Sequence, residues 1–218
     1  MTLAEIREHA DAQIAQGGAA ALSLNGIAKA MGMSGPAMYR YFASRDELLA
    51  TLVAESYEEL ADALAEAVDR ARRRAPERRL RAAVDAYRRW ALDHPHRYRL
   101  VFGSTYGSGA LDPDRVIPAA HRSMAVILAA LAEIGPHDAP RVPDAALARQ
   151  VAEWGRNRGA PTAEPGVLLL GLAAWARMHG VVSLEIEGVF EQVGVDPALL
   201  YQSEVDHLIA QREEPSRP

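Results

Sequence analysis

The chain has 218 residues, of which 49% are hydrophobic and 24% charged, so it can bury the cores of a small domain and a larger one. Its formal net charge of −5 argues against a protein that binds polyanions over its whole surface. The absence of cysteine excludes disulfide bonds, thiolate catalysis and cysteine-ligated metal sites.

The first predicted helix runs from Thr2 to about Gly17, and no apolar signal region precedes it. Thr2 and Glu5 have the spacing of a capping box at its start. The positions expected to be buried are Leu3, Ile6, Ala10 and Ile14. The longest apolar run of the chain, 167–176, is about half the length needed to cross a bilayer. We therefore expect a cytoplasmic protein that does not contact a membrane.

A short helix and a tight turn are predicted next. Ser23 is a good N-cap residue for a helix that ends near Met31, with Ile27, Ala28 and Met31 on its buried side. Gly32 lies where the chain must turn sharply, and glycine adopts the left-handed backbone of such a turn most easily.

Two further helix starts follow within a few residues. Ser34 can cap a helix over 35–42, and Pro36 fits its first turn, where a missing N–H costs nothing. Ser44 and Glu47 form a capping box that begins a long amphipathic helix. The apolar positions of that helix are Leu48, Leu49, Leu52, Val53, Leu60 and Leu64.

Charge sets this segment apart from the rest of the chain. Between Asp11 and Asp46 there is no acidic residue, whereas Lys29, Arg40 and Arg45 lie there. The positive charge is therefore local, and it falls on the short helices that we expect to meet phosphates.

The remaining chain also has helical periodicity. We expect a helix through 80–91, a short one near 98–102, one from Asp112-Pro113 toward Gly135, one after Pro143, and two closing helices over 166–190 and 198–211, with a loop over 155–166. No segment alternates with period two for long enough to form a sheet. The predicted fold class is all-α, with an N-terminal three-helix helix-turn-helix domain and a larger helical domain.

One pattern of residues extends through both short helices into the long one: Ile27-Ala28, Gly32, Ser34, Tyr39, Tyr41-Phe42, Ser44-Arg45 and Glu47-Leu48-Leu49. It resembles the DNA-binding domain of the tetracycline-repressor (TetR) family of bacterial transcriptional regulators. Trp175, followed by His179-Gly180, is similar to the signature of one group of C-terminal domains in that family.

The resemblance implies a DNA-binding domain over residues 1–50 and an effector-binding and dimerisation domain over residues 51–218. It implies a homodimer, joined through the last two long helices, that binds a palindromic operator on double-stranded DNA. The expected function is that of a sequence-specific transcriptional regulator, a repressor released by a small-molecule effector. We expect no enzymatic activity, no cofactor and no metal.

The expected DNA contacts divide into phosphate contacts and base contacts. The predicted phosphate-binding residues are Tyr39, Tyr41, Arg45, Ser44 and Lys29, of which Tyr39, Tyr41 and Arg45 match positions of the family motif. For Tyr41 a place in the core is an equal alternative, and Phe42 is expected in the core. The predicted base-reading residues are Asn25, Ser34, Gly35, Pro36, Ala37 and Arg40.

Base reading by this segment is expected to be sparse. Arg40 could pair with guanine and Asn25 with adenine through two hydrogen bonds each. The residues 35–37 are small, and Gly26 weakens its helix by about 1 kcal/mol relative to alanine. Methyl contacts and DNA shape would then carry more of the selectivity.

The side chains that could line an effector cavity are mainly aromatic, which favours an apolar or aromatic effector. They are Tyr87, Trp90, Tyr98, Phe102, Met124, Trp154, Trp175 and His179. Ordinary core packing is an equal alternative for each of them.

Other residues leave alternatives open. His94 and His96 have a spacing that could serve a metal, but no third ligand is assignable. The arginine-rich run over 70–81 could bind nucleic acid, but we interpret it as a solvated turn between helices. The alternative to a regulator is an all-helical small-molecule-binding protein or enzyme with a vestigial helix-turn-helix.

Overall fold

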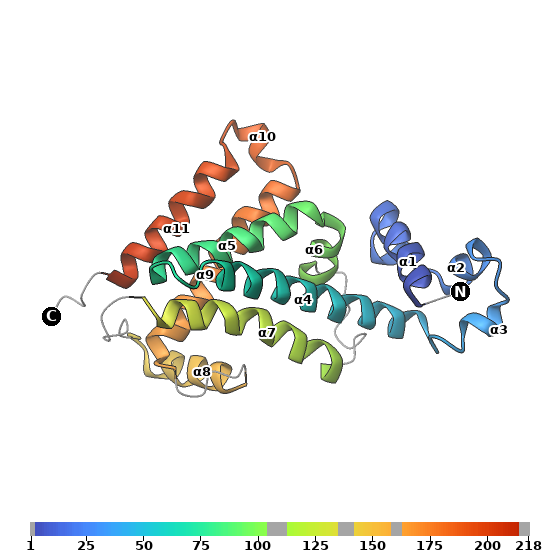
Figure 1. The fold of residues 1–218 in the computed structure, drawn as a ribbon, viewed down its shortest axis with the longest axis horizontal. Helices are drawn as coiled ribbons and strands as arrows, with labels where there is room; N and C mark the ends of the chain where they lie inside the picture. Colours follow the sequence, from blue (N-terminus) through green and yellow to red (C-terminus); the bar gives the residue numbers. More distant parts are fainter. Residues whose placement is uncertain (1–2, 104–112, 135–141, 158–162, 214–218) are drawn as a thin grey trace. The chain divides into compact units, whose positions relative to one another are not determined.

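The computed structural model describes residues 3–103, 113–134, 142–157 and 163–213, which are helical with no strand among them. Figure 1 shows the helices, whose bounds are α1 Leu3–Gly17, α2 Leu24–Ala30, α3 Gly35–Met38, α4 Arg45–Arg70, α5 Pro76–Asp93, α6 Pro95–Phe102, α7 Pro113–Ala132, α8 Ala145–Arg156, α9 Pro165–Ile186, α10 Val189–Val193 and α11 Pro197–Glu213. A 3₁₀ turn, η1, spans Ala19–Ala21. The predicted all-α fold is confirmed.

The chain forms two compact units. The first contains Met1–Glu59 and His94–Ala120, and the second contains Leu60–Asp93 and His121–Pro218. These units differ from a simple division after residue 50, because α6 and the start of α7 pack with the N-terminal helices. The predicted functional division into 1–50 and 51–218 stays a prediction.

The helix-turn-helix forms where its capping residues predict it. The Ser23 hydroxyl accepts from the Gly26 N–H at 3.1 Å, and the Ser34 hydroxyl accepts from the Ala37 N–H at 3.4 Å. Gly32, between α2 and α3, has φ +65°, the left-handed conformation expected of it. Helix α3 is shorter than the predicted 35–42, because regular helix ends at Met38 and a turn continues to the buried Phe42.

Helix α4 begins at the predicted capping box, with one difference in its hydrogen bonds. The Glu47 N–H donates to the Ser44 hydroxyl at 3.1 Å, as a capping box requires. The Glu47 carboxylate accepts from the Ala43 N–H at 2.7 Å, one residue earlier than the usual partner. All six predicted apolar positions of α4, from Leu48 to Leu64, are buried.

The core of the first unit joins α1, α2, α3 and α4 with α6. Leu100 of α6 is buried in the same cluster as Ile6, Ile27, Met38 and Leu48. Leu3 is an exception to the prediction for α1, because its side chain is 44% exposed.

Ion pairs also connect α6 to α1 and α4. Arg97 of α6 pairs with Asp11 of α1 and with Glu59 of α4, and Arg7 pairs with Glu55. Burial raises the pKa of the Glu55 carboxyl, and the two guanidinium groups oppose that shift.

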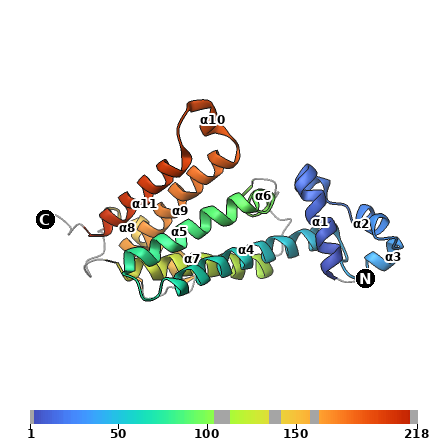
Figure 2. The ribbon, with the colours of Figure 1, turned by 45° about the horizontal axis from the view of Figure 1, so that its top comes forward.

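The second unit is built around α9, which packs against α5, α8, α10 and α11. Figures 1 and 2 show α9 and α11 side by side and connected through α10. Arg88 of α5 donates two hydrogen bonds to Glu185 of α9, and the buried Tyr201 hydroxyl of α11 donates to the Val84 carbonyl.

Helix α9 ends earlier than the predicted 166–190. Gly188 adopts φ +69° and ends the helical run, so Phe190 belongs to the separate short helix α10. Gly194, at φ +67°, ends α10 in the same way.

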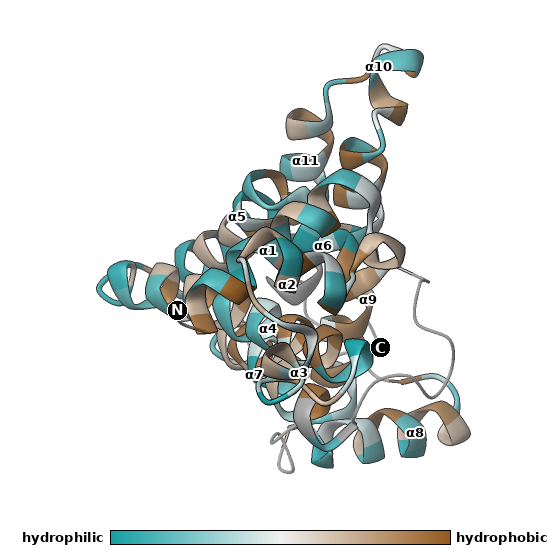
Figure 3. Cartoon of the chain, turned by 90° about the vertical axis from the view of Figure 1, so that its right-hand side faces the viewer, coloured by the Kyte–Doolittle hydropathy of each residue, from teal (hydrophilic) through white to brown (hydrophobic). Residues whose placement is uncertain are grey.

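By length and composition, α9 could cross a membrane, and it is the one such helix in the described part of the chain. This apolar character is visible in Figure 3. A core helix of a globular protein has the same properties, and four other helices pack against α9. We therefore interpret α9 as a core helix.

The arginine-rich run lies at the end of α4, in the turn and in the first turns of α5, as predicted. Its side chains form ion pairs within the protein, including Arg70–Glu66, Arg72–Asp69 and Arg79–Glu133. The predicted cap at Asp112, the Thr2 side of the first capping box and residues 158–162 of the predicted loop lie outside the described residues. The predicted loop over 155–166 is too long at both ends, because α8 continues to Arg156 and α9 begins at Pro165.

Gly171 of α9 has no room for a side chain. A Cβ at this position would lie 2.4 Å from Leu128 Cδ2, and Leu128 is buried. The added methyl overpacks the α7–α9 contact at a cost of about 1–3 kcal/mol, against about 1 kcal/mol gained by replacing a glycine inside a helix, so we expect Gly171→Ala to leave the protein about 0–2 kcal/mol less stable in chemical unfolding.

Leu128→Ala provides the control for that prediction. Alone it should cost about 2–5 kcal/mol by leaving a cavity. The double variant Gly171→Ala/Leu128→Ala should be no less stable than Leu128→Ala alone, because the new methyl occupies vacated space. Additive losses in the double variant would contradict the proposed clash.

Candidate nucleic-acid interface

Of the three aromatic residues at the end of the helix-turn-helix, two have exposed side chains and one has a buried side chain. Tyr39 is 49% exposed and Tyr41 is 39% exposed, whereas Phe42 is 5% exposed. Both phenol groups are therefore accessible to a partner, and Phe42 belongs to the core as predicted. Their phosphate contacts stay predictions.

The residues predicted to read bases lie in α2, in α3 and in the residues next to α3, and all of them reach solvent at least in part. Asn25, Ser34, Pro36 and Arg40 are exposed, and Gly35 and Ala37 are partly exposed. A Cβ on Gly35 would lie 3.8 Å from Asn25 Oδ1, so the start of α3 lies beside the Asn25 amide. Lys29, predicted to bind phosphate, is also exposed.

Arg45 and Ser44 lie at the start of α4, and the Arg45 side chain, which is 40% exposed, bonds to backbone carbonyls of the protein. Its Nε donates to the Leu22 carbonyl at 3.0 Å, and Nη2 donates to the Ala19 carbonyl at 2.5 Å. Nη1 lies 3.3 Å from the Asp46 carboxylate. The phosphate role predicted for Arg45 stays a prediction, and the guanidinium already makes other bonds.

The first turn of α4 carries its own anions. Asp46 and Glu47 both lie in that turn. These carboxylates interact favourably with the partial positive charge at the N-terminus of the helix, and their negative charge repels a phosphate there. Anion binding at this helix start is therefore weaker than a bare helix N-terminus would give.

Sequence reasoning missed Gln13 of α1. Its Oε1 accepts from the Ser23 N–H at 2.8 Å, so it fixes the residue that caps α2. Gly26 lies beside it, because a Cβ on Gly26 would be 2.9 Å from Gln13 Nε2. The glycine that weakens α2 thus leaves room for the Gln13 amide. A polar residue next to the buried Ile14 was the only signal for this contact.

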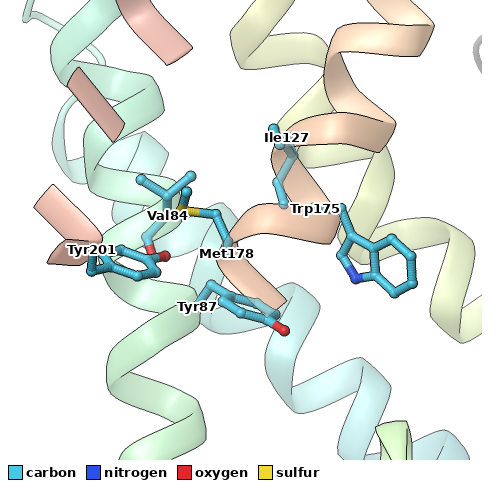
Figure 4. A pocket seen from close by; sticks show the side chains of 7 residues that line it. Val84, Tyr87, Ile127, Trp175, Met178 and Tyr201 are labelled. Carbon is cyan, nitrogen blue, oxygen red and sulfur yellow. The ribbon is translucent and has the colours of Figure 1, made fainter. Parts of the chain in front are cut away.

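A second candidate site is an apolar pocket in the second unit, shown in Figure 4. Side chains from α5, α7, α9 and α11 surround it. They are Val84, Tyr87, Ile127, Ala174, Trp175, Met178 and Tyr201.

The structure brings only some of the predicted effector-contacting residues together. Tyr87 and Trp175 line the pocket, and His179 contacts both of them. Trp90 is buried on α5, and Met124 and Trp154 pack on the cluster formed by Leu128, Val151 and Leu168.

The other two predicted residues belong to the first unit. Tyr98 and Phe102 contact each other there, with ring centroids 5.0 Å apart and the rings tilted by 52°, and Phe102 also contacts Tyr57. Val84, Ala174 and Met178 also line the pocket but were not predicted to do so. Val84 lies one helical turn before Tyr87, and Met178 lies one turn after Ala174, so helical spacing could have indicated them.

His179 lies beside the pocket with polar neighbours on both ring nitrogens. Nδ1 is 3.4 Å from the Tyr87 hydroxyl, and Nε2 is 3.5 Å from the Ser183 hydroxyl. The imidazole stacks on Trp175 with centroids 5.5 Å apart. Burial lowers the pKa of His179, so the neutral ring is favoured in the folded protein.

The described residues contain no group of three or more histidine, aspartate or glutamate side chains placed to hold a metal ion. His94 occupies the N-cap position of α6 without a capping hydrogen bond from its side chain. Burial lowers the pKa of His96.

Comparison with known sequences identifies both parts of the chain. The family described as "Bacterial regulatory proteins, tetR family" matches residues 6–52, and "Tetracyclin repressor-like, C-terminal domain" matches residues 80–208. The HTH-type transcriptional regulators Rv1816 of Mycobacterium tuberculosis and Mb1846 of Mycobacterium bovis are each 32% identical to the chain over 212 residues. That alignment covers 95% of this chain and 90% of each relative.

Solved structures agree with the sequence matches. SCO4313, described as a candidate regulatory protein, is 42% identical, with a TM-score of 0.79 over 95% of this chain and 94% of its own. PfmR of Thermus thermophilus, a TetR family transcriptional regulator, is 19% identical with a TM-score of 0.61, covering 94% and 97% of the two chains. This last likeness shows the fold alone. Together with the sequence matches, these findings show that the chain is a transcriptional regulator and belongs to the TetR family.

Proposed function

We propose that this regulator binds a palindromic operator as a homodimer, represses transcription there and is released by a small-molecule effector. One observation carries the proposal. The exposed positions of α2, α3 and the following turn hold Asn25, Lys29, Tyr39 and Arg40, in a segment without acidic residues. The opposite side of the same helices is buried, so these side chains face outward together.

The proposed phosphate contacts come from groups at the edges of this segment. The Tyr39 and Tyr41 hydroxyls, the Ser44 hydroxyl and the Lys29 ammonium are exposed donors. Each would fix the register of α3 on the duplex without reading sequence.

The proposed base contacts are few. Arg40 and Asn25 carry the side chains that can make two hydrogen bonds to a base. Ser34 offers one hydroxyl, which already accepts from the Ala37 N–H. Gly35, Pro36 and Ala37 offer small surfaces that allow close approach, so DNA shape carries part of the selectivity.

The proposed dimer uses α9 and α11. The apolar residues Val205, Leu208 and Ile209 of α11 are buried within the protomer. The exposed apolar side chains of these helices are better suited, with Leu184 at 45% and Leu199 at 70% exposure. A twofold axis would place helix α3 of each protomer, the helix proposed to read bases, in successive major grooves.

The proposed effector site is the apolar pocket of Figure 4, whose enclosed space of about 10 Å³ has room for about one water molecule, so an effector would bind a conformation in which the surrounding side chains move apart. Its lining of aromatic and aliphatic side chains favours an apolar or aromatic compound, and the Tyr87–His179 pair supplies polar groups at its side. If an effector binds more tightly to the conformation that has the lower operator affinity, effector and operator weaken each other's binding by the same factor.

The location that we propose is the cytoplasm, where a bacterial operator is found. An all-helical enzyme with a vestigial helix-turn-helix is the weaker alternative, because the relatives that match the full chain are described as transcriptional regulators.

Tyr39→Phe tests the DNA interface. Loss of one phosphate hydrogen bond, worth about 0.5–1.5 kcal/mol, should weaken binding to the DNA upstream of the protein's own gene by about two- to tenfold. The measurement is fluorescence anisotropy at fixed salt, with circular dichroism to confirm folding. Tyr57→Phe is the matched control, because its hydroxyl donates to the Val101 carbonyl inside the first unit, and it should leave affinity unchanged. Equal affinity for Tyr39→Phe and the original protein would contradict this contact.

Leu184→Glu/Leu199→Glu tests the dimer. Charged side chains in an apolar interface are costly to desolvate, so sedimentation should report a monomer. Operator affinity should fall about 100-fold, because a monomer holds one half-site without the avidity of two. Ile117→Glu, at an apolar residue 48% exposed in the first unit, should leave the dimer intact. A dimeric double variant would rule out this surface.

His179→Gln tests the environment of the pocket through pH. Because the pKa of His179 is lowered on folding, the unfolded chain binds more protons below about pH 6.5, and folding stability falls as pH decreases through that window. Chemical unfolding at several pH values should show a smaller acid-dependent loss for the variant. The same pH dependence in both proteins would mean that His179 is not buried in its neutral form.

A further inference from the structure

The connector between α1 and α2, Gly18–Ser23, has its carbonyl groups held by Arg45. This residue comes more than twenty positions later, at the start of α4. The guanidinium donates through Nε to the Leu22 carbonyl and through Nη2 to the Ala19 carbonyl, which are the last and first residues of one short turn. The Ala19 carbonyl also accepts from the Leu22 N–H at 3.2 Å, so both donors converge on this turn. Only the planar fork of arginine presents two donors in that fixed geometry.

The connector is held from its other side by α1. Gln13 accepts from the Ser23 N–H, and the absence of a Cβ on Gly26 leaves room for the Gln13 amide. Ser23 in turn caps α2. Helices α1 and α4 therefore fix the same short segment, and that segment determines where α2 begins.

The position of α2 bears on DNA binding through α3. Asn25 lies in the first turn of α2 and beside Gly35 of α3, so a displaced connector moves the surface that would enter the major groove. Binding sites lose affinity when their contacting groups shift by about 1 Å.

We propose that Arg45 is a positioning residue for DNA binding, which acts by holding the connector and not by binding a phosphate. The proposal rests on the proposed function, and it replaces the phosphate role predicted from the sequence. Its bonds to Ala19 and Leu22 are made in the absence of DNA, so Nε and one N–H of Nη2 already hold the connector before any phosphate arrives.

Arg45→Lys separates the two roles. Lysine keeps the charge and is a good phosphate ligand, but its single ammonium cannot reproduce the fork on two carbonyls. Arg45→Gln removes the charge as well. Arg70→Lys, an arginine at the far end of the same helix and 67% exposed, is the matched control.

The first measurement needs no DNA. Amide hydrogen exchange over residues 18–24 should be about tenfold faster in Arg45→Lys and Arg45→Gln, the effect of losing a charge-assisted hydrogen bond. Gln13→Ala should speed exchange of the same segment from the other side, and Arg70→Lys should not. Exchange at the original rate in Arg45→Lys would overturn the proposal.

The second measurement is affinity for the operator. Arg45→Lys should bind about tenfold more weakly, close to Arg45→Gln, and Arg70→Lys should bind normally. Arg45→Lys that binds like the original protein would overturn this inference alone, because lysine then replaces arginine as a phosphate ligand. If the original protein binds no DNA, the proposed function fails, and this role for Arg45 fails with it.

Discussion

The continuity of α4 is the constraint on which the rest of the structure depends. Its 26 residues, Arg45–Arg70, form one helix of roughly 39 Å. Its apolar side supplies Leu48 and Leu52 to the core of the first unit, and Leu60 and Leu64 are buried in the second. Helix α4 therefore contributes side chains to both cores along one uninterrupted helical segment. The proposed effect of a small molecule on DNA binding requires such a connection.

The first unit shows how a small domain fixes a short recognition element. Helix α3 has four residues in regular helix, too few to be stable alone. Its position comes from the Gly32 turn, the Ser34 cap and the fully buried Met38, and helix α6 completes the core with Leu100 and the Arg97 ion pairs. Helix α5 contributes residues to the apolar pocket, and α6, the next helix in the chain, packs on α1–α4.

Local rules predicted much of this from the sequence, and contacts between distant residues account for what was missed. The Ser23 and Ser34 caps, the left-handed Gly32 and the buried stripe of α4 follow from neighbouring residues, and the structure has all of them. The hydrogen bonds of Arg45 to the backbone could not be predicted. Its partners are the carbonyls of residues 19 and 22, and every residue has a carbonyl, so no residue type in the sequence indicates this contact. The break at Gly188 was missed because apolar periodicity continues through it to Phe190. The pocket lining was predicted in part, since aromatic residues indicate a core but not which of them face a common space.

Selection from a pool of random DNA duplexes tests the central claim most directly, because it assumes no operator. The purified full-length protein is bound to the pool at physiological salt, and the retained duplexes are sequenced over several rounds. We predict an enriched palindrome whose half-sites lie about one or two helical turns apart, with the strongest base preferences confined to a few positions. Retention of DNA without any enriched sequence, or enrichment of a single unpaired half-site, would contradict it.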